Sequence, residues 1–280
     1  MAKIQQKIVI YTDFSSVGQK SIEWGIFLAK KFEKNILLIH VIDNNSKNYF
    51  KNEDVFDAAT KMLTVLCKEI EEKENILIEH YVEEGCTCKI INSTAEKNDA
   101  FLVILGSHSR NDLQFLSAVE IGKIIRKSRI PYFIVQKNSP KPNNNHSIFL
   151  PIDLRKENKE KTGWVSYFAK NIKTNIKIIS TINNDNTINN NIIFCSKFFN
   201  ELNLNYEKII INCSFFSNIE YESVKFSINN DALCVVILTT KEENFINKIF
   251  GFREDKIISN KFGMPILCIN PKKDLYIPCI

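Results

Sequence analysis

Two apolar runs in the first half of the chain end in polar residues that could bind a ligand. Thr12 and Asp13 follow residues 8–11, and Gly106 follows residues 101–105. Continuous apolar runs of this length are typical of parallel strands that helices cover on both faces. Open α/β sheets bind ligands at the carboxyl ends of such strands, where a glycine allows a sharp turn and a close approach of the ligand. The two strand ends therefore predict a binding site.

The residues after Gly106 carry groups that suit an anion. His108 could face a phosphate, and the guanidinium of Arg110 presents a fork of donors that pairs with one. Simpler roles stay open, because a loop histidine is often only solvated and Arg110 is equally well explained as a surface charge. Asp13 also has two interpretations, as a ligand-binding carboxylate or as a cap of the helix that follows it.

The sequence lacks the constellations of common enzymes. It has no Gly-x-Ser-x-Gly elbow, no Walker phosphate loop, no His-Glu-x-x-His and no GxGxxG after its first strand. The four histidines fall singly, at positions 40, 80, 108 and 146, and their spacing suggests no triad. We therefore expect a protein that is not an enzyme.

Composition indicates an ordinary globular protein. The 280 residues are 44% hydrophobic and 25% charged, and the formal charge of +5 is small and spread along the chain, which gives little support to nucleic-acid binding. No segment approaches the roughly 20 apolar residues of a membrane span. The sequence enters a strand at once and shows no signal-peptide pattern, so we expect no membrane association and a cytoplasmic location.

The eight cysteines predict neither a disulfide framework nor a metal site. Cys67, Cys195, Cys234 and Cys268 fall inside apolar helix or strand patterns, which favours buried free thiols. The cysteines at positions 86 and 88 are too closely spaced for a zinc knuckle, and no second pair completes one.

The alternation of patterns in the first half predicts an α/β fold. Apolar runs indicate strands at 8–11, 36–41, 76–81, 101–105 and 132–135, with helical periodicity between them and a polar loop at 44–52. Strands that alternate with helices at this spacing imply right-handed crossovers and a parallel, doubly wound sheet of five strands. In the helix before Pro131 we expect isoleucines toward the core and Arg126 on the opposite face.

The chain also repeats itself. WGIFLAKKFEKNILLIH, from Trp24, aligns without a gap to WVSYFAKNIKTNIKIIS, from Trp164, at an offset of 140 residues. The patterns around Pro131 and Pro265 match as well. We therefore predict two tandem domains and divide the chain into a first domain at 1–137, a linker at 138–146, a second domain at 147–272 and a tail at 273–280.

The second copy keeps the strands of the first. Strands are indicated at 148–152, 208–212 and 232–238. Between the first two of these, the Asn-rich tract INNDNTINNN at 182–191 predicts a low-complexity loop with nothing to bury, and a helix resumes at 192.

The second copy does not keep the polar loop. Asp153 takes the place of Asp13, but Thr239-Thr240-Lys241 stands where the first copy has Gly106. Gly251 is at best an out-of-register remnant of a third glycine. We expect the second copy to support the first structurally rather than to bind a ligand.

At these residues the sequence resembles the universal stress protein family. The family pattern is a strand ending in Gly, two residues, a second Gly, nine residues, Gly with Ser or Thr, a helix and a Pro, and the stretch from Gly106 to Pro131 is similar to it. The opening IVIYTDFSSVGQKSIEWGIFLAKKFEKNILLIHVID resembles the family's first strand, helix and second strand. The resemblance implies two flavodoxin-like or Rossmann-like domains, each with a five-stranded parallel sheet.

The resemblance also implies a nucleotide site in the first domain. ATP or another adenine nucleotide would bind there, with Mg²⁺ accompanying it. An aspartate at position 13 would lie near the nucleotide and hold the ribose, or Mg²⁺ through water, and the residue at position 41 would pack beside adenine. The matching positions are Thr12, Asp13, Val41, Gly106, Ser107, His108, Ser109 and Arg110.

The phosphate-binding part departs from the family pattern. Ser109 stands at the second glycine, and Ala118 and Val119 stand where Gly and Ser or Thr belong, once one residue is deleted. Val119 offers no hydroxyl, and its branched side chain suits a backbone cradle poorly. These departures argue against phosphate binding of the usual kind.

Two functional hypotheses follow from the sequence. The first is a cytoplasmic stress-response protein that is not an enzyme and binds an adenine nucleotide weakly in its first domain. The second is a scaffold for an unidentified protein partner that has lost nucleotide binding. Because paired domains of the family associate through their last strands, the resemblance implies an intramolecular pseudo-dimer with 132–135 against 266–270. A homodimer of the whole chain is a further expectation.

Overall fold

The computed structural model describes residues 6–43, 54–108, 116–182, 185–212, 218–239 and 253–270. The first half of this described chain contains the strands β1 (Lys7–Tyr11), β2 (Asn35–Ile42), β3 (Ile78–Glu84), β4 (Leu102–Ser107) and β5 (Tyr132–Gln136). The second half contains β6 (Ser147–Pro151), β7 (Ile176–Thr181), β8 (Tyr206–Ile211), β9 (Ala232–Leu238) and β10 (Ile266–Ile269).

Helices connect these strands in both halves. Those of the first half are α1 (Ser16–Phe32), α3 (Val55–Glu74), α4 (Thr87–Lys97) and α5 (Ala118–Lys127). Those of the second half are α6 (Asn158–Ile172), α7 (Asn186–Glu201), α8 (Ile219–Ser227) and α10 (Arg253–Ile258).

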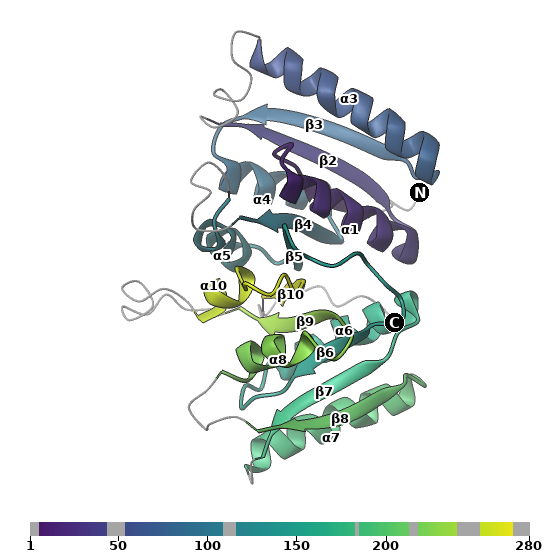
Figure 1. The fold of residues 1–280 in the computed structure, drawn as a ribbon, viewed down its shortest axis with the longest axis vertical. Coiled ribbons are helices and arrows are strands. Elements are labelled where there is room, and N and C mark those ends of the chain that lie inside the picture. Colours follow the sequence, from purple (N-terminus) through teal and green to yellow (C-terminus); the bar gives the residue numbers. More distant parts are fainter. Residues whose placement is uncertain are drawn as a thin grey trace.

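Hydrogen bonds join the described strands into one sheet, in the order β3-β2-β1-β4-β5-β10-β9-β6-β7-β8 (Figure 1). Pairings within each half are parallel, whereas β5 and β10 pair antiparallel, with Phe133 opposite Leu267. The predicted α/β class, the five strands of each copy and the pairing of the two last strands are confirmed. The order of the second half mirrors that of the first, so the halves are related by an approximate two-fold rotation.

Helices cover both faces of the sheet. One core cluster lies beneath α1, α3, α6 and α7, and the other lies beneath α4, α5, α8 and α10. Strands β4 and β9 are buried along their whole length, which explains why their sequences are almost entirely apolar. Aromatic rings continue the first core across the junction of the halves, since the ring centroid of Phe32 lies 4.7 Å from that of Phe168 and Phe101 lies 5.4 Å from Trp164.

The Asn-rich tract differs from the prediction. We expected a loop over 182–191, but α7 includes most of this tract. Asp185 caps the helix by accepting from a backbone N–H of its first turn. Asn191 is buried, and its amide donates to two carbonyl groups of the loop after β6. The polar composition of the tract suggested a loop with nothing to bury. The structure differs because Asn191 is buried and binds backbone carbonyl groups.

Arg126 also differs from the prediction. Its side chain does not lie in solvent on the face opposite the core, but is 9% exposed at the junction of the halves. There it lies 3.4 Å from Glu254 and 3.6 Å from Asp255, so it links α5 to α10. The predicted loop at 44–52 and the tail at 273–280 lie outside the described residues, and the domain boundaries stay predictions.

The four cysteines predicted to be buried are free and buried, as expected: Cys67, Cys195, Cys234 and Cys268. Burial raises the pKa of the Cys67 thiol to about 11, which makes it a poor nucleophile at neutral pH. Cys86 and Cys88 are free as well. No helix in the described part of the chain is long and apolar enough to cross a membrane.

Each half of the protein caps a helix of the other half. Asn270 directly follows β10, is 1% exposed, and donates from its amide to three carbonyl oxygens at the end of α5, at 2.9 to 3.0 Å. Carbonyl groups at a helix end have no partner within the helix. At the corresponding end of β5, the amide of Gln136 donates to the carbonyl of Ile258, the last residue of α10, at 2.6 Å. The junction therefore depends on side-chain amides as well as on strand pairing.

We expect Asn270→Leu to lower the free energy of unfolding by about 2 kcal/mol, because the buried carbonyl groups of Arg126 and Ser128 lose the amide that donates to them. The carbonyl group of Ile125 also loses this amide but keeps the N–H of Ser128 as a donor. Urea unfolding followed by circular dichroism measures the loss. The matched control is Asn138→Ala, since the exposed amide of Asn138 donates across the same junction to Lys261, at 3.2 Å. The control should cost less than about 0.5 kcal/mol, and equal losses for the two variants would contradict the assignment.

Candidate functional site

The turn after β1 holds Asp13 against the start of α1. Asp13 accepts from the backbone N–H of Ser15 at 3.0 Å and from its hydroxyl at 2.5 Å. Ser15, rather than Asp13, is the N-cap of α1 and accepts from the N–H of Gly18 at 3.1 Å. Gly18 makes room for this arrangement, because a Cβ there would lie 2.7 Å from the Asp13 carboxylate. Phe14 has a φ of 61°, a left-handed conformation that is uncommon for a bulky residue.

His108 binds Asp13 across the sheet. Its Nε2 lies 2.8 Å from Asp13 Oδ2, and the two side chains are 4% and 10% exposed. Asp13 follows β1, His108 follows β4, and these strands are neighbours in the sheet. From this point the chain continues to opposite sides of the sheet, which is the kind of place where open α/β sheets bind ligands. The structure thus brings together two of the residues that the sequence singled out.

The Asp13 carboxylate is charged and has partners on both oxygens. Burial raises the pKa of Asp13, but hydrogen bonds from His108 and Ser15 outweigh burial and hold that pKa below its usual value. Oδ1 accepts from Ser15 and Oδ2 from His108. No group of three or more metal-ligating side chains occurs among the described residues. Mg²⁺ held by Asp13 through water therefore stays a prediction.

His40 lies beneath this turn. Its Nδ1 is 2.9 Å from the backbone oxygen of Thr12, to which it donates, and its ring contacts that of Phe14 with the centroids 4.5 Å apart. Burial lowers the pKa of His40, so the ring is neutral at pH 7. His40 therefore supports the turn from below rather than contributing a charge to the site.

The other predicted site residues lie at the same edge of the sheet. Thr12 is buried, and its hydroxyl accepts from the backbone N–H of Phe14 at 3.2 Å. Val41 is fully buried near the end of β2. Ser107 ends β4 and is 3% exposed, and its hydroxyl has no hydrogen-bond partner within the described residues. Ser109 and Arg110 lie outside the described residues.

Gly106 allows a helix to pack closely. It lies inside β4, and a Cβ there would be 2.4 Å from a methyl group of Val17 and 3.1 Å from the hydroxyl of Ser21, both on α1. We expected a sharp turn and a close ligand at this glycine. The structure instead continues the strand through it, and the close neighbour is α1.

The start of α5 carries a carboxylate where a phosphate-binding helix would present free N–H groups. Ser117 is its N-cap and forms a capping box with Glu120, whose carboxylate accepts from the Ser117 backbone N–H at 2.8 Å. Ala118 and Val119 form the first turn. Since the partial positive charge of a helix start attracts anions, a carboxylate already bound there opposes a phosphate.

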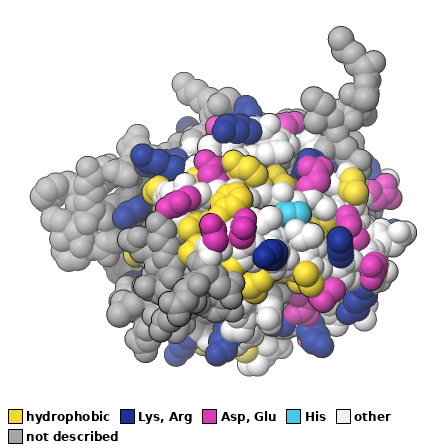
Figure 2. All heavy atoms as spheres, turned by 90° about the horizontal axis from the view of Figure 1, so that it is seen from above, with side chains coloured by type: hydrophobic (Ala, Val, Ile, Leu, Met, Phe, Trp, Pro, Cys, Tyr) yellow, Lys and Arg dark blue, Asp and Glu magenta, His cyan; other side chains and the backbone are white. Residues whose placement is uncertain are grey.

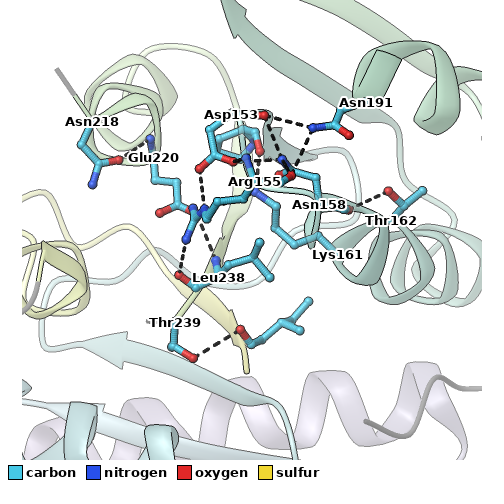
Figure 3. Close-up of polar contacts among 12 residues, drawn as sticks. Asp153, Arg155, Asn158, Lys161, Thr162, Asn191, Asn218, Glu220, Leu238 and Thr239 are labelled. Atoms are coloured by element: carbon cyan, nitrogen blue, oxygen red, sulfur yellow. Dashed lines mark hydrogen bonds and ion pairs between the residues drawn. The ribbon is translucent and has the colours of Figure 1, made fainter. Parts of the chain in front are cut away.

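The second copy fills the equivalent place with its own charges (Figure 3). Arg155 stands two residues after Asp153, as Ser15 stands after Asp13. Its Nε lies 2.6 Å from Asp153 and its Nη2 2.6 Å from Glu220 of α8. Its Nη1 donates at 3.0 Å to the carbonyl of Leu238, which ends β9. One guanidinium therefore connects the ends of β6 and β9.

Lys161 completes this network from beneath. It is fully buried, donates to the carbonyl of Pro151 at 2.5 Å and lies 3.7 Å from Glu220. Burial lowers the pKa of Lys161, although Glu220 and Asp153 oppose the shift. Two cations thus share the carboxylate of Glu220, which also accepts from the backbone N–H of Leu238 at 3.0 Å. In the described part of the second copy, this edge is therefore occupied by charged groups that pair with one another.

Comparison with known proteins identifies the fold of both halves. Residues 5–136 match the sequence profile of the universal stress protein family. They form a universal stress protein domain. A universal stress protein of Methanocaldococcus jannaschii is 24% identical over 142 residues, which are 48% of this chain and 84% of the relative. The family predicted from the motifs is confirmed.

Solved structures match nearly the whole chain, among them the following two. The crystal structure of a universal stress protein from Archaeoglobus fulgidus covers 97% of this chain and 98% of its own, with a TM-score of 0.71 at 15% identity. That of a functionally unknown protein from Pseudomonas aeruginosa covers 95% of this chain and 93% of its own, with a TM-score of 0.65 at 15% identity. At these identities the likeness shows the fold, which includes the second half.

Sequence reasoning missed several residues that shape the universal stress protein domain and its repeat. The Ser-x-x-Glu pattern at 117–120 is a capping-box signature and could have been found. The roles of Ser15 and Gly18 depend on how the turn folds back, which no local pattern shows. Arg155 could have been noticed by comparing the residues that follow Asp13 and Asp153, but its partner on α8 is distant in sequence.

Asp13 should make stability depend on acid pH. A carboxyl whose pKa is lower in the folded than in the unfolded state contributes stability above the ordinary value of 3.8, and this contribution is lost as the pH falls through the folded-state pKa. Asp13→Asn should therefore be destabilised relative to wild type at pH 6, with a difference that shrinks below about pH 4. Unfolding in urea over a pH series measures it. Asp231→Asn, at a side chain 85% exposed, is the control, and a pH-independent difference for Asp13→Asn would refute the assignment.

We expect Glu220→Gln to lower the free energy of unfolding by about 3 kcal/mol, because it removes the carboxylate 3.7 Å from the fully buried Lys161 and leaves the more weakly placed Asp153 to offset that charge. On the same helix, Glu222 forms an exposed pair with Lys225 at 3.0 Å. Glu222→Gln is therefore the matched control and should cost less than about 0.5 kcal/mol. Chemical denaturation of wild type, Glu220→Gln and Glu222→Gln measures their free energies of unfolding. Similar losses for the two variants would show that the buried network is not important for stability.

Proposed function

We propose that this protein is a cytoplasmic stress-response protein, not an enzyme, whose first domain binds one adenine nucleotide weakly. The site lies where β1 and β4 end, around Thr12, Asp13 and residues 106–110, with Val41 beneath the base. The second domain binds no nucleotide and stabilises the first through the junction. ATP, ADP and AMP are the candidate ligands.

Two observations carry the proposal: the Asp13–His108 pair, and the buried hydroxyl of Ser107, which directly precedes His108 at the end of β4. The pair joins two strand ends at 2.8 Å, and the hydroxyl of Ser107 is buried without a partner among the described residues. Buried polar groups rarely stay unpaired, so this hydroxyl can accept or donate a hydrogen bond to a polar ligand. In the second copy the same region has Arg155 across it. The difference favours a single site in each chain.

Weak binding follows from the charges at this edge. Asp13 is ionised, and the carboxylate of Glu120 caps the first turn of α5. A triphosphate bound at this edge would therefore lie near two negatively charged side chains of the described structure. Each of them raises the free energy of a bound anion. The base and ribose would then contribute most of the affinity, which favours AMP or ADP over ATP.

The Glu120 capping box favours a second candidate function. If its carboxylate excludes phosphate altogether, the protein acts without a nucleotide, as a scaffold for a protein partner. This function predicts no effect of adenine nucleotides on stability. It is a separate outcome of the experiment that follows.

A thermal-shift titration with AMP, ADP and ATP, with and without Mg²⁺, tests the proposal. A nucleotide that binds only the folded state raises its stability by about 2.7 kcal/mol at a hundred times its dissociation constant. We expect a rise in melting temperature, and calorimetry should give one site per chain. No shift at millimolar nucleotide would overturn the proposal in favour of the scaffold, and two sites per chain would refute the proposal that the second domain binds no nucleotide.

Ser107→Ala locates the site. We expect a loss of nucleotide affinity of about two- to tenfold, which corresponds to one hydrogen bond, with little change in stability because the hydroxyl has no described partner. Ser223→Ala is the matched control, since the Ser223 hydroxyl is also buried and unpartnered in the described structure but lies on α8. Equal affinities for both variants would place the nucleotide elsewhere.

A further inference from the structure

The two copies differ in how their first two helices meet. In the second copy α6 packs directly on α7, with Thr162 Oγ1 3.1 Å from Cys195 Sγ and the ammonium of Lys159 5.0 Å from the ring centroid of Phe194. In the first copy a groove of about 520 Å³ separates the equivalent helices, α1 and α3. A volume of this size lies within the range of small-molecule sites. The first two helices therefore pack against each other in the second copy, whereas a groove lies between them in the first copy.

The groove between α1 and α3 is mainly apolar. Ile22 and Ile70 form part of its floor and belong to the buried core. Met62 and Val65 line it from α3 although they are 38% and 56% exposed, and Phe14 lines it near the carboxyl edge of the sheet. Exposed apolar side chains that converge on a concave surface are typical of a ligand site rather than of scattered surface residues.

Several exposed apolar residues lie at the α3 end of the molecule, among them Met62 and Val65. Seen from that end, hydrophobic side chains lie together in the middle of the face, with acidic and basic side chains around them (Figure 2). Residues 54–84, which include α3 and β3, contain nine Asp or Glu and three Lys. This excess of negative charge disfavours contact with an extended anionic membrane surface. A single carboxylate meets the same opposing charges, which the ammonium group of Lys61 in the groove lining offsets. A small molecule within the groove is the better occupant.

Two hydrogen-bond donors line the groove and have no partner among the described residues. Gln19 on α1 carries an amide, and Lys61 on α3 carries an ammonium group. The carboxylate of Glu69 also lines the groove, eight residues or about 12 Å further along α3. An anionic head group beside Lys61 therefore avoids Glu69, while an apolar chain covers the residues between them.

We propose that the groove between α1 and α3 binds a medium-chain monocarboxylate. Its acyl chain lies on Ile22, Met62 and Val65, and its carboxylate lies beside Lys61 and Gln19. This site is separate from the proposed nucleotide site, which uses residues at the ends of β1 and β4. Among the described residues, both sites include Thr12, whereas Lys61 and Val65 belong to the groove and can be changed without altering a residue assigned to the nucleotide.

Calorimetry of the full chain with hexanoate, octanoate and decanoate tests the apolar part. We expect one site per chain and an affinity that rises about fourfold with each added methylene group, which corresponds to about 0.8 kcal/mol per buried methylene. Val65→Glu should lower the affinity for decanoate at least tenfold, because it places a carboxylate in the lining. Ile193→Glu on α7 is the matched control: that residue is 62% exposed but lies away from the groove, and its variant should bind decanoate like wild type.

The head group is tested with Lys61→Gln. This variant should lower the affinity for decanoate about two- to fivefold at low salt, the range of an exposed ion pair, and should leave binding of decanol unchanged. The absence of saturable decanoate binding, or equal binding by Val65→Glu and Ile193→Glu, would overturn the groove as a site. Tighter binding of decylamine than of decanoate would overturn the carboxylate as its head group. Melting curves without ligand confirm that each variant is folded.

Discussion

The antiparallel pairing of β5 with β10 joins two parallel sheets, and the arrangement of the rest of the molecule depends on it. Each strand would otherwise be an exposed sheet edge, which invites association with other chains. Because this pairing relates the halves by an approximate two-fold rotation, each half can place an amide at a helix end of the other, through Gln136 and Asn270. The same rotation brings α1 and α6 together on one face of the sheet, where Phe32 contacts Phe168.

Two copies of one fold have diverged within this frame. In the second copy, Arg155 and Lys161 surround Glu220 in the described part of the edge that corresponds to Asp13 and His108. Helix α6 of this copy packs on α7, with Thr162 against Cys195. Buried ion pairs contribute little net stability, because desolvation offsets the attraction between the charges, but they strongly disfavour arrangements that separate them. The network therefore fixes the shape of the second copy. The first copy keeps a small polar pair and an open groove instead.

The sequence predicted the architecture well and the site only in outline. Apolar runs and the repeat at Trp24 and Trp164 determined the strands, because buried parallel strands leave a continuous local pattern. The site depends on contacts between residues far apart in sequence, such as Asp13 with His108, which no local pattern encodes. Gly106 shows the same limit, since its sequence context suggested a ligand while its close neighbour is a helix. The prediction of a loop from composition was wrong at Asn191, because this polar residue is buried within a helix.

We propose that one copy binds a nucleotide, whereas charged groups occupy the equivalent strand ends of its repeat. Hydrogen–deuterium exchange with and without saturating AMP separates the two copies, because both are followed in one sample. We expect AMP to slow exchange in the turn after β1, around Ser15 and Gly18, and to leave exchange in the turn at Arg155 and Asn158 unchanged. Slower exchange at Arg155 and Asn158 on addition of AMP would refute this difference between the copies.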